Sequence, residues 1–138
     1  MSEKSFFVTT DKSKFNLEII HTFLKNSYWA KDISFDIVKS SIQNSYCFGA
    51  FLNDNQIGFA RVITDYNSLA YLLDVFIINE FQNKGFGRQL LDSVFNDQKL
   101  SKIKKWMLAT NDAHALYKQY GFYILDNSSN KYMIRERS

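Results

Sequence analysis

The chain of 138 residues contains no proline, five glycines and one cysteine. With Cys47 as its single cysteine it cannot form an internal disulfide, which is typical of proteins in a reducing cytosol. No apolar run reaches transmembrane length, and the first residues, Met1-Ser2-Glu3-Lys4, lack the apolar core of a signal peptide. We therefore expect a cytoplasmic protein without membrane association.

The chain also has little excess of either charge sign. The net charge is +3, and the lysines and arginines are scattered rather than gathered in a basic stripe. This argues against a dedicated nucleic-acid binder but suits a polyanionic cofactor. Hydrophobic residues make up 46% of the chain and aromatic residues 17%, which is enough for one core. We expect one domain over residues 1–138, without repeats or linkers.

The most informative stretch begins as an apolar, β-branched run over Asp74–Ile78, which is typical of a buried strand. Helical periodicity starts again at Phe86. Between these patterns lies Gln82–Gly87, whose two glycines allow the backbone to approach a ligand closely. Amides at a helix N-terminus favour an anion, and Lys84 and Arg88 add positive charge. The stretch predicts a diphosphate site.

Two common nucleotide motifs do not fit this stretch. A P-loop requires Lys-Ser/Thr after its last glycine, but Arg88 and Gln89 follow Gly87. A dinucleotide fingerprint requires a third small residue where Leu90 stands. It also requires an acid about 20 residues further on, where the basic stretch Lys102–Lys105 lies.

Residue patterns predict seven strands and four helices. The expected strands are Phe6–Thr10, Tyr46–Leu52, Gln56–Thr64, Leu69–Ile78, Trp106–Ala109, Phe122–Leu125 and Tyr132–Arg135. The expected helices are Phe15–Asn26, one that starts after Ser34, Gly85–Asp97 and Asp112–Tyr120. The order β-α-α-β-β-β-α-β-α-β-β indicates an α+β domain with a mostly antiparallel sheet.

Two motifs in this order resemble the GNAT acetyltransferase superfamily. The first is Gln/Arg-x-x-Gly-x-Gly/Ala after a strand, here from Gln82 to Gly87. The second is Leu-Tyr followed by Gly-Phe, here from Leu116 to Phe122. The resemblance implies the GNAT fold, acetyl-CoA as co-substrate, an amine acceptor and no metal. Family members often pair through an edge strand, so it also suggests a homodimer.

The resemblance assigns cofactor contacts along three segments. The pyrophosphate is expected at Gln82, Asn83, Lys84, Gly85, Phe86, Gly87 and Arg88. The pantetheine arm is expected beside the backbone of Val75, Phe76 and Ile77, although a merely buried strand would have the same side chains. Family members often have Asn seven residues before the tyrosine; here Thr110 stands there and Asn111 follows, and either could reach the cofactor.

Tyr117 matches the position of the family's proton donor. A neutral phenol, with a pKa near ~10, can protonate a leaving thiolate, whose thiol titrates near ~8.5. The alternative is a core tyrosine whose hydroxyl is bonded by backbone. Tyr120 matches no family position.

Asp74 is the one carboxylate of its strand, and burial requires that it have a partner or a role. In the functional interpretation, Asp74 accepts the proton of the amine, directly or through water, or binds the ammonium group. With a four-residue turn over Asp65–Ser68, however, Arg61 would lie opposite Leu72, diagonal to Asp74, and form an ion pair. Some family members carry an acid on the fifth strand, where Lys105 and Trp106 stand here.

Tyr28 and Trp29 lie between the first two helices, where the family forms one wall of the acceptor site. They could stack on an amine or ammonium group, or pack in the core. Together these features predict direct acetyl transfer to a primary amine of a small molecule or peptide. The alternative is a GNAT-like acyl-CoA sensor or interaction module without turnover.

Overall fold

The computed structural model describes residues 5–125 and 131–137, and the chain divides into two units, Met1–Leu108 and Ala109–Ser138. Unit 1 holds the strands β1 (Phe6–Thr9), β2 (Tyr46–Leu52), β3 (Asn55–Thr64), β4 (Ala70–Ile77) and β5 (Trp106–Met107). It also holds the helices α1 (Leu17–Lys25), α2 (Phe35–Gln43) and α3 (Phe86–Phe95), with short 3-10 turns at Lys12–Lys14, Asn79–Phe81 and Gln98–Leu100. Unit 2 contains α4 (His114–Lys118).

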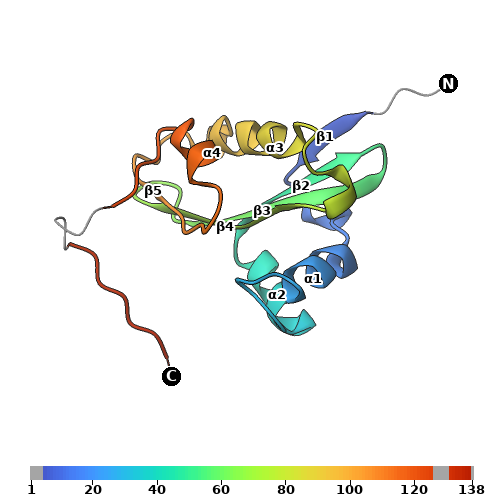
Figure 1. Cartoon of the computed structure of the whole chain (residues 1–138), viewed down its shortest axis with the longest axis horizontal. Coiled ribbons are helices and arrows are strands. Elements are labelled where there is room, and N and C mark those ends of the chain that lie inside the picture. Colours follow the sequence, from blue (N-terminus) through green and yellow to red (C-terminus); the bar gives the residue numbers. More distant parts are fainter. Residues whose placement is uncertain (1–4, 126–130, 138) are drawn as a thin grey trace. The chain divides into compact units, whose positions relative to one another are not determined.

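The sheet has five strands in the order β1-β2-β3-β4-β5. Neighbours are antiparallel except β4 and β5, which are parallel. In unit 1, α1 and α2 cover one face of the sheet and α3 covers the other (Figure 1). The expected α+β class, the mostly antiparallel sheet and the element order as far as α4 are confirmed.

Over residues 5–125 and 131–137 the structure has five strands, whereas about seven were expected for the whole chain. The structure assigns no strand to Phe122–Leu125 or Tyr132–Arg135; most of the turn expected between them, residues 126–130, lies outside the described part of the chain. The short apolar runs there predicted the two strands of a last hairpin. Instead, Tyr123 is 78% exposed and Met133 is 96% exposed, and a strand without a partner leaves its backbone groups unpaired.

The first two helices form because capped ends flank apolar stripes. Asn16 accepts a hydrogen bond from the Ile19 N–H at the start of α1 (3.1 Å). Ser34, the expected N-cap, accepts from the Ile37 N–H at the start of α2 (3.3 Å). The apolar stripes join a core cluster made of Phe15, Ile20, Leu24, Val38, Ile42, Cys47, Phe51, Phe59 and Phe76.

On the other face, α3 contacts β2, β3 and β4 through its buried residues Leu90, Leu91 and Val94. Two layers of helix therefore enclose the central strands. In the described part of the chain, no helix has the length and apolar character needed to cross a bilayer.

Candidate active site

The parallel strand β5 reaches only the start of β4. Ala70 pairs with Trp106 and Tyr71 with Met107, and the Ala70 N–H donates to the Lys105 C=O (3.0 Å). Within the described residues of unit 1, the rest of β4 has no partner strand on this edge. The two strands therefore separate, leaving one edge of Leu72–Ile77 open.

The backbone groups of β4 alternate between this open edge and β3. The Ile78 N–H donates to the Ile57 C=O of the β3 side (2.8 Å). The Phe76 carbonyl also faces β3, because a Cβ built on Gly58 would lie 2.8 Å from its oxygen. The residues in between, Val75 and Ile77, consequently direct their N–H and C=O groups toward the other edge, where the Ile77 C=O already accepts from Gln82 Nε2 (2.8 Å).

A bulge interrupts the β3–β4 ladder next to these residues. Two residues of β4, Asp74 and Val75, lie opposite Ala60 of β3. Asp74 has a φ of +55°, in the left-handed region that non-glycine residues rarely adopt. Bulges of this kind redirect side chains and are frequent beside active sites.

The bulged Asp74 carries a nearly buried ion pair. Its Oδ2 accepts from Arg61 Nε at 2.8 Å, and the side chains of Arg61 and Asp74 are 13% and 9% exposed. Its Oδ1 accepts from Trp29 Nε1 at 2.9 Å. Arg61 Nη1 also donates to Ser45 Oγ (3.0 Å). Both carboxylate oxygens therefore have a donor, as the ion-pair interpretation requires.

The sequence-based register behind that ion pair was wrong by one residue. Arg61 lies opposite Leu73, not Leu72. The hairpin loop spans residues 65–69 rather than 65–68, because Thr64 Oγ1 donates to the Leu69 C=O (2.6 Å) and closes a longer turn. The bulge then returns Asp74 to the face of Arg61, so the pair forms despite the shifted register.

The turn between β4 and α3 combines two left-handed residues with a helix start. Asn83 and Gly85 have φ values of +63° and +86°. Gly85 is the N-cap of α3 and brings no side-chain cap. The first bond of the helix runs from the Gln89 N–H to the Gly85 C=O (3.2 Å), so the N–H groups of Phe86–Arg88 point out of the helix end. Such an end favours an anion.

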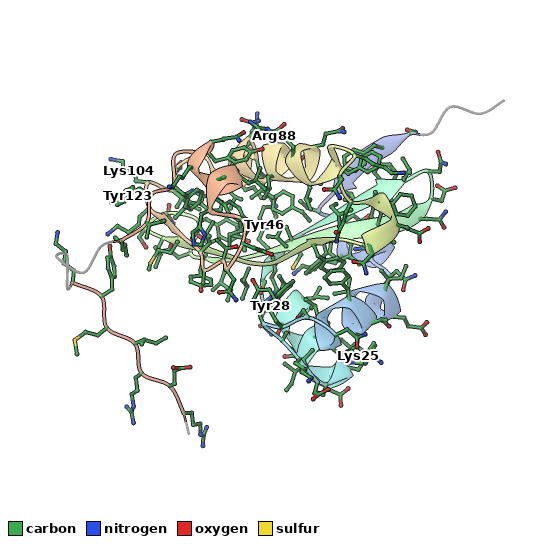
Figure 2. All side chains as sticks on the ribbon, in the orientation of Figure 1. Lys25, Tyr28, Tyr46, Arg88, Lys104 and Tyr123 are labelled. Carbon is green, nitrogen blue, oxygen red and sulfur yellow. The ribbon has the colours of Figure 1, made fainter. Side chains whose placement is uncertain are left out.

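The side chains of this turn have separate tasks. Gln82 Nε2 donates to the Ile77 C=O (2.8 Å) and ties the turn to the end of β4. The Phe86 ring stacks on Phe6 of β1, with ring centroids 5.0 Å apart. Phe86 can therefore contribute its backbone N–H to the predicted diphosphate site, but not its side chain. Lys84 and Arg88 are exposed. Figure 2 shows Arg88 on α3, on the side of the sheet opposite Tyr28.

A cavity of about 800 Å³ opens on the α1 side of unit 1. It is lined by Glu18, Ile19, Thr22, Phe23, Asn26, Ser27, Tyr28, Trp29, Ile78 and Asn79. Both predicted acceptor residues, Tyr28 and Trp29, belong to this lining. Trp29 also bonds to Asp74, so the structure joins the cavity wall to the β4 bulge.

Sequence reasoning missed most of this lining. Phe23, an apolar residue of the expected first helix, lines the cavity. Glu18, Thr22 and Asn26 follow one another at intervals of four residues along α1. Residues at that spacing share a helix face, so a polar stripe beside Phe23 was the available signal.

Unit 2 holds the remaining predicted residues. Thr110 Oγ1 accepts from the Ala113 N–H (3.1 Å) at the start of α4, and the exposed Asn111 lies beside it in the chain. Tyr117 lies in α4, with its ring edge-to-face on Phe122 (5.8 Å).

Gly121 ends α4 as expected. It has a φ of +93°, and the bonds from Gly121 N–H to Lys118 C=O (3.1 Å) and from Phe122 N–H to Tyr117 C=O (3.2 Å) form a Schellman motif. The helix is shorter than the expected Asp112–Tyr120. The motif fixes the chain direction directly after Tyr117.

Cys47 and His21 have environments that fit a structural role rather than a catalytic one. Burial raises the pKa of the Cys47 thiol from 9.0 to about 12, which keeps the thiol protonated and unreactive. The His21 ring contacts the Ile33 carbonyl through Nε2 (2.9 Å). His114 is exposed on α4.

Comparisons with known proteins identify the family of this chain. The family profile "Acetyltransferase (GNAT) domain" matches residues 43–124. A protein of Gibberella zeae that is provisionally named an acetyltransferase is 28% identical over 81% of this chain and 75% of its own.

Solved structures give the same result. A GNAT-family structure from Xanthomonas campestris pv. campestris superimposes with a TM-score of 0.90 at 39% identity, covering 96% of this chain and 94% of its own. A GNAT acetyltransferase of Elizabethkingia anophelis with acetyl-CoA bound has a TM-score of 0.63 at 22% identity, with 96% and 88% covered. The fold is thus that of the GNAT acetyltransferases. The chain is a member of the GNAT acetyltransferase family, which uses acetyl-CoA.

Proposed function

We propose that the protein is an acetyl-CoA-dependent N-acetyltransferase that transfers the acetyl group directly to a primary amine. The observation that carries the proposal is the open edge of β4, where Val75 and Ile77 direct backbone groups to a place that β5 does not reach. An extended pantetheine arm bonds to such an edge as a further strand would.

The turn after β4 suits the other end of the co-substrate. The amides at the start of α3 and the exposed Lys84 and Arg88 would hold the pyrophosphate. In the proposed assignment, Thr110 and Asn111 are further cofactor contacts from unit 2. Tyr28 and Trp29 form a wall of the proposed acceptor site. We also propose that residues 1–138 act as one domain.

The reaction needs one bond to form and one to break. The neutral amine nitrogen attacks the thioester carbonyl, the C–N bond forms, and the C–S bond breaks. In our proposal, Tyr117 gives its phenolic proton to the leaving thiolate and regains one from solvent. The extra proton of the amine leaves to water, or to Asp74 through water. Asp74 can take it only in competition with its bonds to Trp29 and Arg61.

Release of free thiol from acetyl-CoA in the presence of a panel of primary amines tests the proposal. Thiol release that depends on the amine, with an acetylated product of matching mass, is expected. Binding of acetyl-CoA without any thiol release would favour the alternative, a GNAT-like acyl-CoA sensor. One observation favours the sensor: β5, which consists of Trp106 and Met107, carries no carboxylate that could act as a base.

Two further properties are proposals of the same kind. A homodimer would cover apolar side chains such as Met133 and Ile134, which are 96% and 84% exposed, and sedimentation velocity would detect it. A cytoplasmic location stays a prediction from the single, buried Cys47. Neither nucleic acid nor membrane is among the proposed partners.

A further inference from the structure

Three aromatic rings stand in different planes in the lining of the α1-side cavity. Tyr28 and Trp29 meet edge to face, with ring centroids 5.1 Å apart and planes at 80°. Phe23 is tilted by 44° from Trp29 at 6.3 Å. We name these three residues the aromatic cage. In the Tyr28–Trp29 contact the edge of one ring lies on the face of the other, and each ring face that this packing leaves uncovered can attract a cation.

Two rings of the aromatic cage are held in place by contacts with β4. The Phe23 ring stacks on Phe76 of β4 at 4.0 Å, with planes 5° apart. The Trp29 N–H donates to Asp74, so the indole presents its ring rather than a hydrogen-bond donor to the cavity. Phe23 and Trp29 are thus held in place and offer their rings with little loss of side-chain entropy on binding, whereas Tyr28 is 59% exposed.

The lining of the cavity carries negative charge and no positive charge. Glu18 is its one charged residue, and the lining includes no lysine or arginine. The other polar members are neutral: Thr22, Asn26, Ser27 and Asn79. An anionic group would meet a carboxylate and π faces here, whereas a cation would be attracted by both.

We propose that this cavity binds a cationic nitrogen group, and that the acceptor amine therefore carries a second cation a few carbons from its reactive nitrogen. The inference rests on the proposed function, because only a transferase has an acceptor. The reactive amine must be neutral to attack the thioester. The ammonium group in the cage must consequently be a different nitrogen of the same molecule.

Three acceptors of the form H₂N–(CH₂)₅–X test the inference: 1,5-diaminopentane, n-hexylamine and 6-aminohexanoate, in which X is cationic, neutral or anionic. We expect kcat/KM for the diamine to exceed that for hexylamine about 10-fold, with the amino acid lowest. Tyr28→Leu and Glu18→Gln should each reduce this preference. Tyr123→Leu and Asp36→Asn, which change an exposed tyrosine and an exposed carboxylate outside the lining, should retain it.

A binding measurement without turnover completes the test. In a Trp106→Phe background, Trp29 is the single tryptophan. Tetramethylammonium chloride should change its fluorescence saturably, sodium chloride of equal ionic strength should not, and Tyr28→Leu should weaken the change.

The outcomes separate the two proposals. Equal kcat/KM for the three amines overturns the inference and leaves the proposed function intact, and a preference for the anionic acceptor does the same. Absence of thiol release with every amine contradicts the proposed function. In that case the tetramethylammonium titration alone decides whether the cage binds a cation, and no saturable change overturns it.

Discussion

Asp74 occupies an unusual position for a carboxylate, because it lies inside a strand with a left-handed backbone. Such a conformation costs about 1–3 kcal/mol and persists only where surrounding contacts enforce it. Arg61 and Trp29 supply these contacts, one to each oxygen. A single side chain thus stabilises the bulge of β4 and orients a wall of the α1-side cavity.

Asp74→Asn should lower the free energy of unfolding by about 3 kcal/mol, because it leaves the nearly buried Arg61 guanidinium without a counter-charge. Urea denaturation measures the change. The double variant with Arg61→Gln should lose less than the sum of the two single variants. A loss below about 0.5 kcal/mol for Asp74→Asn would show that the ion pair does not hold the bulge.

Tyr117→Phe should reduce kcat about 100-fold, because phenylalanine cannot protonate the departing thiolate. The affinity for acetyl-CoA, measured by calorimetry, should change little, since the ring remains. Tyr120→Phe is the matched control from the same segment and should keep kcat within about 2-fold of wild type. Unchanged turnover in Tyr117→Phe would remove this residue from the mechanism.

At the scale of elements, β4 and the turn that follows it could be read from the sequence because their signals are local. The β-branched run, the two glycines and the renewed helical spacing each specify backbone conformation within a few residues. The bulge could not be read in the same way. Its cause is tertiary: the bonds of Asp74 to Trp29 and Arg61 bridge residues 45 and 13 positions apart in the chain.

Gly85→Ala should weaken acetyl-CoA binding and lower stability by about 1 kcal/mol. The added Cβ meets nothing within 4 Å, so the cost arises from the φ of +86°. Gly121→Ala is a matched control, since Gly121 also has a positive φ (+93°) and open space around it. Chemical denaturation should show similar losses for both variants, and calorimetry should show weaker binding for Gly85→Ala alone. Equal affinities would exclude this turn from the cofactor site.

The hairpin between β3 and β4 shows a second limit of sequence reasoning. The turn composition was right, but the loop is one residue longer than expected, and the Thr64 hydroxyl bonds to the Leu69 carbonyl across it. Turn-forming residues indicate that a turn is present without specifying its length.

At the scale of the whole molecule, the sequence indicated the α+β class, the element order and the family, because hydrophobic periodicity and two motifs extend over much of the chain. The two last strands were not found in the described residues. A short apolar run of strand-forming residues shows that a segment could be a strand, but it does not show which strand pairs with it. Tyr123 and Met133 lie in apolar runs of this kind, but both are exposed and neither lies in a paired strand.

Stability should fall as the pH rises above 9. Burial raises the pKa of Cys47 from 9.0, and burial together with the Asp97 bond raises that of Tyr46 from 10.0, in each case to about 12. Both folded values lie above the unfolded ones, so this stabilisation is complete below pH 9 and is lost between pH 9 and 12.

Urea denaturation at several pH values measures this loss. Cys47→Ala should flatten the decline between pH 9 and 10, by at most about 1.4 kcal/mol per pH unit, because one titrating group is removed. The same slope in the variant would contradict the assigned pKa shift.

Amide hydrogen exchange, followed by NMR with and without saturating acetyl-CoA, tests the central claim most directly. The account predicts that the amides of Val75 and Ile77 at the open edge of β4, and those of Phe86–Arg88 at the start of α3, exchange more slowly in the complex. Unchanged exchange at these amides, or protection confined to other segments, would contradict it.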